Sequence, residues 1–281
     1  MPLLILVSLL WAFSFGLIKR LTGFDGAFIS AARLGIALLV FIPFLRLRGV
    51  AIRTGVSLAA IGAVQFGLMY LAYNESFRYL KSHEVALFTL TTPILVTLLA
   101  DAFDRRLRGR ALLAALLAVA GGACIVVKST PGSSALRGVA LVQLSNIAFA
   151  LGQVLYRRVR AASVGGNFRD RDVFGLLYLG ALAVTLPVSL LRTDFSALPL
   201  TTTNLGILAY LGVVASGFGF FLWNLGATRV SAGTLAVMNN AKIPLGILVS
   251  ILIFHESAEP WRLIASGALI ALGVWLAEMK K

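Results

Sequence analysis

Charged residues are scarce in this sequence, and acidic residues are the scarcest of them. Of the 281 residues, 13% are charged, with 11 Asp and Glu against 25 Lys and Arg. A soluble domain carries about a quarter charged residues, whereas here 59% of the chain is hydrophobic. The composition therefore indicates a membrane protein and excludes an ordinary soluble domain.

Cysteine and histidine are nearly absent, which excludes several kinds of site. The single Cys124 rules out an intrachain disulfide and a cysteine-rich metal site. His83 and His255 fall in separate loops, without metal-ligand spacing or the clustered acids that an enzyme needs. Neither glycine-containing loop, 129–137 or 160–172, ends like a phosphate-binding motif. We therefore expect no metal, no cofactor and no enzymatic activity.

Apolar runs recur along the whole chain. Each is close to the length of about 20 residues that a helix needs to cross a bilayer. The loops between them are short, so little of the chain is left for a soluble domain. We predict an all-α integral membrane protein with ten transmembrane helices, at residues 2–18, 27–45, 55–73, 84–102, 111–127, 136–156, 173–191, 206–223, 232–254 and 262–278.

The basic residues gather in the loops between these apolar runs. With the N-terminus in the cytoplasm, the inner loops and C-terminus hold 15 Lys and Arg, and the outer loops hold 8. Cytoplasmic loops of membrane proteins carry such an excess. We therefore predict a multi-pass protein of a bacterial-type inner (plasma) membrane with both termini in the cytoplasm. The same rule accounts for the net charge of +14, so no nucleic-acid partner is expected.

The chain contains an internal repeat. The stretch YNESFRYLKSHEVALFTLTTPILVTLLADAF reads much like WNLGATRVSAGTLAVMNNAKIPLGILVSILIF. An offset of 150 residues pairs Asn74 with Asn224, and after one inserted residue Pro93 pairs with Pro244. The sequence therefore indicates that one unit of five spans has been duplicated.

The duplication predicts two domains, residues 1–128 and 129–281, each a five-helix repeat. Because five is odd, the second repeat enters the membrane from the opposite side, and the two are inverted. Inverted repeats serve alternating access around a substrate site near the middle of the bilayer. We therefore expect a central midplane cavity at the interface of the two repeats.

Several motifs extend over the chain in a recognisable order. They are LLWAFSFGLIKR in the first span, its partner NIAFALGQVLYRR in the sixth, proline-centred fourth and ninth helices, Arg33, and FHE ending at Glu256. Together they resemble the drug/metabolite transporter superfamily, EamA type. One departure is that Asp101 or Asp104 stands where a glycine–glutamate pair is expected after the fourth span. The resemblance implies a secondary transporter, often an exporter, of amino acids, their derivatives, or small amphipathic metabolites and drugs.

Polar residues near the centres of the predicted spans mark the candidate site. Polar groups in hydrocarbon are costly, so they usually face a bundle interior or a wet cavity. Trp11 and Phe15 lie one turn apart and are candidate aromatic walls of the cavity. The predicted substrate-binding residues come from both repeats: Lys242, Asn239, Trp11, Phe15, Gln65, Thr89, Thr92, Asn146 and Ser216.

Lys242 is the sharpest feature of this set. Its side chain reaches about 6 Å, whereas the half-thickness of the hydrocarbon is about 15 Å, so the ammonium cannot easily reach the membrane surface. Asn239 lies three residues earlier, on the same helical face. An ammonium and an amide together suit a carboxylate. The alternative is a structural lysine, bonded to carbonyls near Pro244 or paired with Glu84.

The remaining candidates also have structural interpretations. Central amides and hydroxyls often serve as hydrogen bonds between helices, and aromatic residues often pack or face lipid. Tyr73 and Trp223 are candidate gates or members of the aromatic belts. Glu84 is a candidate coupling carboxylate or a solvated helix start. Arg33 is expected to pair with Asp25 or with lipid headgroups, and contact with the substrate is the less favoured alternative.

Three functions are compatible with these residues. The sequence favours a secondary transporter that exports or exchanges amino acids or related carboxylates by alternating access. A second function is export of neutral or cationic drug-like compounds, with Lys242 structural. A lipid flippase is least favoured, because it would need several basic residues along a lateral groove. The expected partners are a small-molecule substrate and the lipid bilayer, and the protein is expected to be a monomer or a homodimer.

Overall fold

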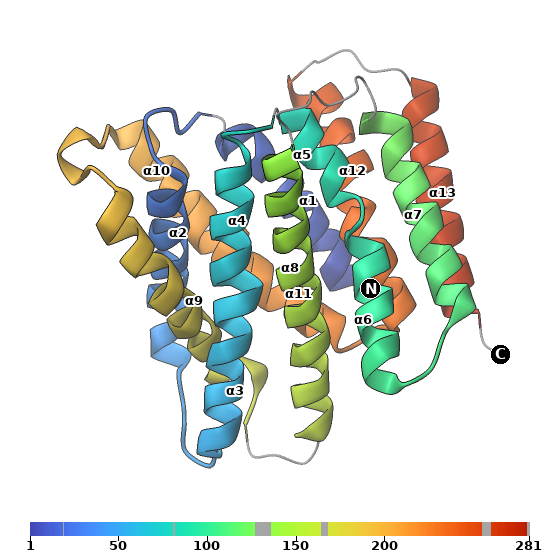
Figure 1. Cartoon of the computed structure of the whole chain (residues 1–281), viewed down its shortest axis with the longest axis horizontal. Coiled ribbons are helices and arrows are strands. Elements are labelled where there is room, and N and C mark those ends of the chain that lie inside the picture. The colour runs from blue at the N-terminus through green and yellow to red at the C-terminus, as the bar shows by residue number, and fades with distance from the viewer. Residues whose placement is uncertain (19, 81, 127–135, 164–167, 255–259, 280–281) are drawn as a thin grey trace.

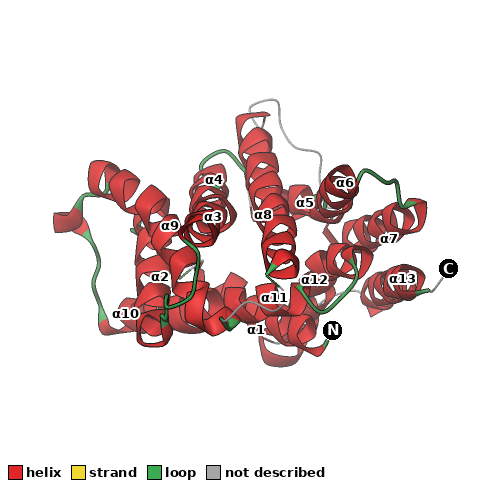
Figure 2. Ribbon diagram, turned by 90° about the horizontal axis from the view of Figure 1, so that it is seen from below, coloured by secondary structure: helices red, strands yellow, loops and turns green. Residues whose placement is uncertain are grey.

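The computed structural model describes residues 1–18, 20–80, 82–126, 136–163, 168–254 and 260–279, and the regular elements among them are all helices (Figures 1 and 2). The predicted all-helical class is confirmed for these residues. The α-helices are α1 Pro2–Ile18, α2 Gly26–Phe41, α3 Ile52–Gly62, α4 Met69–Ser76, α5 Ser82–Thr89, α6 Thr92–Asp104, α7 Gly109–Val126, α8 Leu136–Ala162, α9 Asp170–Arg192, α10 Thr202–Tyr210, α11 Gly219–Ala227, α12 Ala232–Phe254 and α13 Pro260–Glu278.

The helices coincide with the ten predicted apolar ranges. Among the described residues, six helical segments are long and apolar enough to cross a membrane, and α1, α7 and α13 contain shorter apolar stretches. The helix α12 has 23 residues. The chain is therefore a multi-pass membrane protein, while the number of ten crossings stays a prediction. The six segments are Gly26–Phe44, Ile52–Ser76, Val85–Asp104, Leu136–Ala162, Asp170–Arg192 and Thr202–Ala227.

Two of these segments change helix type in the middle. A π-helical stretch, Ala63–Leu68, joins α3 to α4, and a second, Leu211–Phe218, joins α10 to α11. The π-helix is rare and often marks a functional position. The two stretches lie about one repeat offset apart in the chain, which agrees with the predicted duplication. The inverted relation of the two repeats stays a prediction.

The fourth predicted span is broken, whereas the ninth is continuous. The helix α5 ends at Thr89 and α6 begins at Thr92, with Pro93 in its first turn. By contrast, α12 runs through Pro244 without ending. A proline removes one helical hydrogen-bond donor, yet only the first of these two helices is interrupted. At the break beside Pro93, donors from α8 and α12 reach the Phe88 and Leu90 carbonyls.

Close helix contacts hold the bundle together. A methyl group added to Gly62 would lie 1.9 Å from the Leu177 carbonyl oxygen, and one added to Gly180 would lie 1.8 Å from the Ala59 carbonyl oxygen. The backbones of α3 and α9 therefore touch, which requires glycine at both positions. At one end of the molecule, α7 and α13 lie side by side (Figures 1 and 2). These two helices therefore pack against each other within one chain.

Candidate functional site

A cavity of about 110 Å³ lies among eight helices, α1, α2, α4, α5, α6, α8, α11 and α12. It receives side chains from both predicted repeats. Its lining combines aromatic rings, hydroxyls, one amide and two cations. The described lining residues are Trp11, Ser14, Ile18, Arg33, Met69, Tyr70, Tyr73, Thr89, Thr92, Ser145, Asn146, Phe149, Phe220 and Lys242.

Lys242 places its ammonium beside an aromatic ring. The Nζ atom lies 5.7 Å from the centre of the Trp11 ring, within the range of a cation–π contact. Among the described residues, no hydrogen bond or ion pair reaches this ammonium. The side chain of Glu84, the acid considered as its partner, lies outside the described residues. The Lys242 side chain therefore lines the cavity, with its ammonium beside the Trp11 ring.

Trp11 is fixed in place by its surroundings. Its indole N–H donates to the Ala215 carbonyl oxygen at 2.9 Å, within the second π-helical stretch. Its ring lies 4.9 Å from that of Trp223 and meets the rings of Phe149 and Phe220 edge-on at 6.0 and 5.7 Å. Aromatic pairs in this geometry stabilise one another beyond their burial. The result is a rigid aromatic wall under the Lys242 ammonium.

The observed partners of Arg33 differ from those expected from the sequence. Asp25 does not pair with it, because this carboxylate caps α2 by accepting from two backbone N–H groups. The Arg33 side chain is instead buried, with its Nε donating to Ser216 Oγ at 3.1 Å and its guanidinium 4.4 Å above the Tyr70 ring. The Tyr70 hydroxyl also contacts Ser216 Oγ, at 3.1 Å. Arg33 is therefore a second cation of the cavity, held by neighbours on different helical segments.

The electrostatics of the cavity follow from these two cations. Both Arg33 and Lys242 line it, and none of its described lining residues is acidic. A buried charge without a partner is costly, so such groups normally meet a counter-ion or water. Aromatic rings supply much of the remaining surface. The arrangement suits a small anion with an apolar body.

Polar residues of the lining also stabilise the break between α5 and α6. Pro93 has no N–H to donate to the Thr89 carbonyl, four residues earlier. This carbonyl instead accepts from the Thr92 hydroxyl at 2.7 Å. The Phe88 carbonyl accepts from the Asn146 amide at 2.9 Å. These bonds compensate the missing helical ones. Of the predicted residues, Thr92 and Asn146 therefore act as structural donors while also lining the cavity.

Asn240 completes the same arrangement from α12. Its amide, which is buried, donates to the Leu90 and Ala118 carbonyls, each at 3.1 Å. The bond to Leu90 connects the ninth predicted span with the break in the fourth. Asn240 therefore serves as a hydrogen bond between helices.

Four predicted site residues do not line the cavity: Ser216, Gln65, Asn239 and Trp223. Ser216 accepts a hydrogen bond from the lining residue Arg33. Gln65 and Asn224 exchange two amide hydrogen bonds, at 2.8 and 3.1 Å. Asn239 bonds to Gln153, which also accepts from the Trp223 indole at 2.9 Å.

The shared face predicted for Asn239 and Lys242 therefore does not bring both groups to one cavity. Asn239 is buried at 3% exposure in the hydrogen-bonded layer beside it. Trp223 is 1% exposed, so its interpretation as part of an aromatic belt is wrong. Tyr73, predicted as a gate, lines the cavity. The side chain of Phe15 lies outside the described residues.

Several lining residues were missed by the sequence reasoning. Phe149 and Phe220 gave no signal, because aromatic residues in apolar spans are common. Arg33 gave one, as an ionisable residue inside a span, but the expected partner was Asp25, its neighbour in the sequence. Its real partner, Ser216, is 183 residues away in the chain.

Membrane-length helices around a small cationic cavity define a membrane protein that binds a small molecule. Residues 1–127 and 136–279 match the EamA-like transporter family. The chain belongs to the EamA-like transporter family, as its motifs suggested. It is accordingly a transporter of small molecules and not an enzyme.

Similar proteins cover nearly the whole chain. A probable biotin transporter of Pseudomonas aeruginosa is 43% identical over 281 residues, covering 99% of this chain and 98% of that one. The biotin transporter of Escherichia coli K12 is 42% identical over 280 residues, covering 98% and 92%. A solved protein structure superimposes with a TM-score of 0.81 at 18% identity, covering 99% and 96%. This last likeness concerns the fold.

Proposed function

We propose that the chain is a secondary transporter of biotin or a closely related apolar monocarboxylate, working by alternating access between the two predicted repeats. The observation that carries this proposal is that two cations, Arg33 and Lys242, line one cavity whose described lining has no acidic residue. Relatives more than 40% identical over nearly the whole chain are named biotin transporters, which supports the same cargo.

The chemistry of biotin matches the lining. Its carboxylate supplies a counter-ion that Arg33 and Lys242 do not find among the described residues, and its aliphatic chain and sulfur-containing ring suit the walls around Trp11. Its ureido group offers two N–H donors and a carbonyl acceptor to hydroxyl and amide groups such as Ser145 and Asn146. At about 110 Å³ the cavity accommodates part of this molecule. We expect it to widen when the substrate enters, as alternating access requires.

The lining argues against the amino-acid cargo expected from the sequence. An amino acid carries an α-ammonium beside its carboxylate, and that ammonium would be brought close to two cations with no acid among the described lining residues. Like charges in a medium of low dielectric constant repel strongly. Cationic drug-like compounds meet the same objection. An anion with an uncharged body is therefore favoured.

The test is uptake of radiolabelled biotin into proteoliposomes that contain the purified protein. Competitors are desthiobiotin, biotin amide, heptanoate, phenylalanine and lysine. We expect desthiobiotin to compete well and biotin amide, which lacks the negative charge, to compete at least tenfold more weakly. Absence of biotin uptake, or competition by the amino acids as strong as that by desthiobiotin, would overturn the proposal.

Lys242→Gln tests the residue directly. Removing a charged hydrogen-bond partner costs about 1.5–3 kcal/mol, which corresponds to a loss of affinity of about ten- to a hundredfold. Arg78→Gln is the control, because Arg78 is exposed and does not line the cavity. Biotin amide should bind Lys242→Gln and the wild type equally. Wild-type biotin affinity in Lys242→Gln would show that the ammonium does not hold the carboxylate.

A further inference from the structure

A second hollow, of about 1660 Å³, lies at one end of the bundle, where α6, α8 and α13 end and where α3, α7 and α12 begin. We call it the basin. The excess of arginine in the loops predicts that this end is cytoplasmic. The helices α6, α8 and α12 line both the basin and the transport cavity. The same helices therefore connect the two hollows.

A short segment of each connecting helix separates the cavity from the basin. These segments span between five and twelve residues, which is about 8 to 18 Å along a helix. The cavity and basin residues that bound them are Phe149 and Val154 on α8, Lys242 and Gly233 on α12, Phe220 on α11 and Thr228 just after it, and Met69 and Ser57 on the segment from α3 to α4.

Polar side chains occupy all four of these intervening segments. Gln153 lies on α8, Asn239 on α12, Trp223 and Asn224 on α11, and Gln65 in the first π-helical stretch. We call these five residues the amide layer. Each of them is at most 3% exposed, and none of them lines the cavity or the basin. The layer therefore lies between the two hollows.

Hydrogen bonds join the amide layer from helix to helix. Gln153 Oε1 accepts from the Trp223 indole at 2.9 Å and from the Asn239 amide at 3.2 Å. The remaining two amides bond to each other. A methyl group added to Gly152, the neighbour of Gln153, would lie 2.2 Å from Gln65 Cβ. The two groups of hydrogen bonds are therefore adjacent and form one layer.

Polar side chains at this level suit a barrier that opens. Apolar side chains of the same volume would also separate two hollows, without the cost of burying amides. Water can replace a polar contact when the helices separate. Gln153 and Asn239 also donate to the Phe149 and Leu235 carbonyls of their own helices, at 3.2 and 2.8 Å. These two amides therefore keep a partner when the layer opens.

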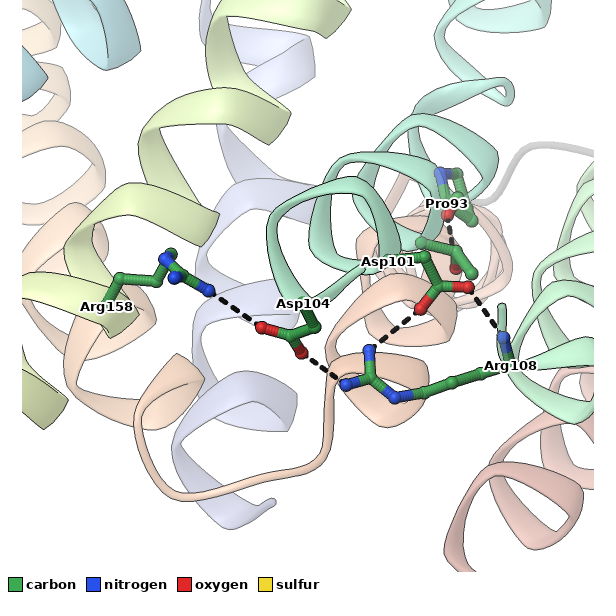
Figure 3. Close-up of polar contacts among 6 residues, drawn as sticks. Pro93, Asp101, Asp104, Arg108 and Arg158 are labelled. Carbon is green, nitrogen blue, oxygen red and sulfur yellow. Dashed lines mark hydrogen bonds and ion pairs between the residues drawn. The ribbon is translucent and has the colours of Figure 1, made fainter. Parts of the chain in front are cut away.

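Further polar contacts hold the same helices together at the basin. Arg158 on α8 donates to Asp104 at the end of α6 at 2.7 Å, and Asp104 also accepts from Arg108 (Figure 3). Asp104 and Arg158 are exposed, and exposed ion pairs contribute little to stability. The link between α6 and α8 can therefore open at little cost, which leaves the buried amide layer as the main barrier.

We propose that the amide layer is the gate between the transport cavity and the cytoplasm, closed in this structure, and that the basin is the vestibule through which the cargo passes when the layer opens. This inference rests on the proposed transport by alternating access, and not on which carboxylate is carried. Seven arginines and two aspartates line the basin, so its positive charge attracts the same class of anion.

Thiol labelling from one side of the membrane tests the gate. Cys124→Ser removes the single native cysteine, and Ser14→Cys then places one thiol in the cavity. The reagent is the anionic, membrane-impermeant sulfonatoethyl methanethiosulfonate, applied to membrane vesicles. Leu107→Cys, at an exposed basin residue, identifies the vesicle face that carries the basin. From that face we expect Ser14→Cys to react about a hundredfold more slowly than Leu107→Cys, because the open conformation is a minor one.

Gln153→Leu, combined with Ser14→Cys, should open the gate. It keeps the volume of the side chain but removes the hydrogen bonds to Trp223 and Asn239. The buried indole N–H loses this acceptor in the closed layer, whereas water reaches it in the open one. We expect basin-side labelling to rise about tenfold. Asn239→Leu is a second variant of the same layer and should raise labelling in the same direction.

Asn74→Ala, combined with Ser14→Cys, is the matched control. The Asn74 amide also joins two helices, donating to Ser30 Oγ at 2.7 Å and to the Gly26 carbonyl at 3.2 Å. It lines neither hollow and shares no hydrogen-bond partner with the amide layer. Asn74→Ala should therefore change basin-side labelling by less than about twofold.

Two outcomes would overturn the gate. An equal rise in Asn74→Ala and Gln153→Leu would show a general loosening of the bundle, and unchanged labelling in both layer variants would show that the layer closes nothing. Biotin uptake by the wild type distinguishes the two proposals. Its absence would defeat the proposed transport, whereas uptake together with unchanged labelling would defeat the gate alone.

Discussion

The two cations of the cavity are supported in different ways. Arg33 on α2 is held by a hydrogen bond to Ser216 and by the ring of Tyr70. Lys242 on α12 rests on the Trp11 ring, and the structure records no hydrogen bond to it among the described residues. The first cation has a hydrogen-bond partner that orients it, and the second has only the aromatic ring among the described residues. We infer that Arg33 sets the position of a bound carboxylate, while Lys242 follows it.

The two cations should differ most in how biotin affinity responds to Arg33→Lys and to Lys242→Arg. Arg33→Lys keeps the charge but loses the planar donor fork and the bond to Ser216, so we expect biotin affinity to fall about ten- to a hundredfold. Lys242→Arg keeps the positive charge at a position where no directed hydrogen bond to a described residue is lost, and we expect biotin affinity to change by less than about threefold.

Equilibrium binding of radiolabelled biotin in detergent measures both variants, and their melting temperatures show that they are folded. Equal losses in the two variants would mean that the cations are equivalent, and the inferred difference between their roles would be wrong.

A smaller effect is expected from Ser216→Ala. Ser216 Oγ accepts from Arg33 and contacts the Tyr70 hydroxyl, so the variant releases the guanidinium while leaving every lining residue in place. We expect a loss of affinity of about tenfold, from one hydrogen bond to a charged group.

The double variant with Lys242→Gln tests whether the two cations act separately. If they do, the two losses of binding free energy should add. Strong non-additivity would show that loosening Arg33 also disturbs Lys242.

The smallest effect is expected from Tyr70→Phe. This variant removes the hydroxyl contact with Ser216 and keeps the ring under Arg33. One hydrogen bond between neutral groups contributes about 0.5–1.5 kcal/mol, and Arg33 keeps its own bond to Ser216, so we expect affinity to fall by about threefold. A loss as large as that of Ser216→Ala would indicate that the Tyr70 hydroxyl contacts the substrate itself.

The sequence predicted the helices well because the bilayer sets their length. An apolar run of about 20 residues is long enough to cross the hydrocarbon as a helix and is rare in soluble domains. Each predicted range coincides with helical structure. The interruptions were harder to predict. Pro93 and Pro244 have the same local chemistry, but only the first lies at a break, where donors such as Asn146 and Asn240 arrive from other helices. No local pattern contains that information.

The candidate site was predicted in part for the same reason. Lys242 was identified because a charge in the middle of a span has a large cost wherever its partner lies. Asn239 was placed on the same face by its spacing of three residues, yet such a spacing leaves about 60° between side chains. That angle is enough to turn Asn239 toward Gln153 and away from the cavity. Arg33 was assigned to a nearby acid when its partners lie on other segments.

The position of Trp11 gives the protein an optical reporter of its own cavity. Its indole lines the site beneath the Lys242 ammonium, so a carboxylate that draws the ammonium away changes the electric field on the ring and shifts its fluorescence. Trp223 is buried behind it, while Trp261 and Trp275 are 60% and 59% exposed on another part of the surface. A ligand-dependent emission change that disappears in Trp11→Phe therefore reports occupancy without any label.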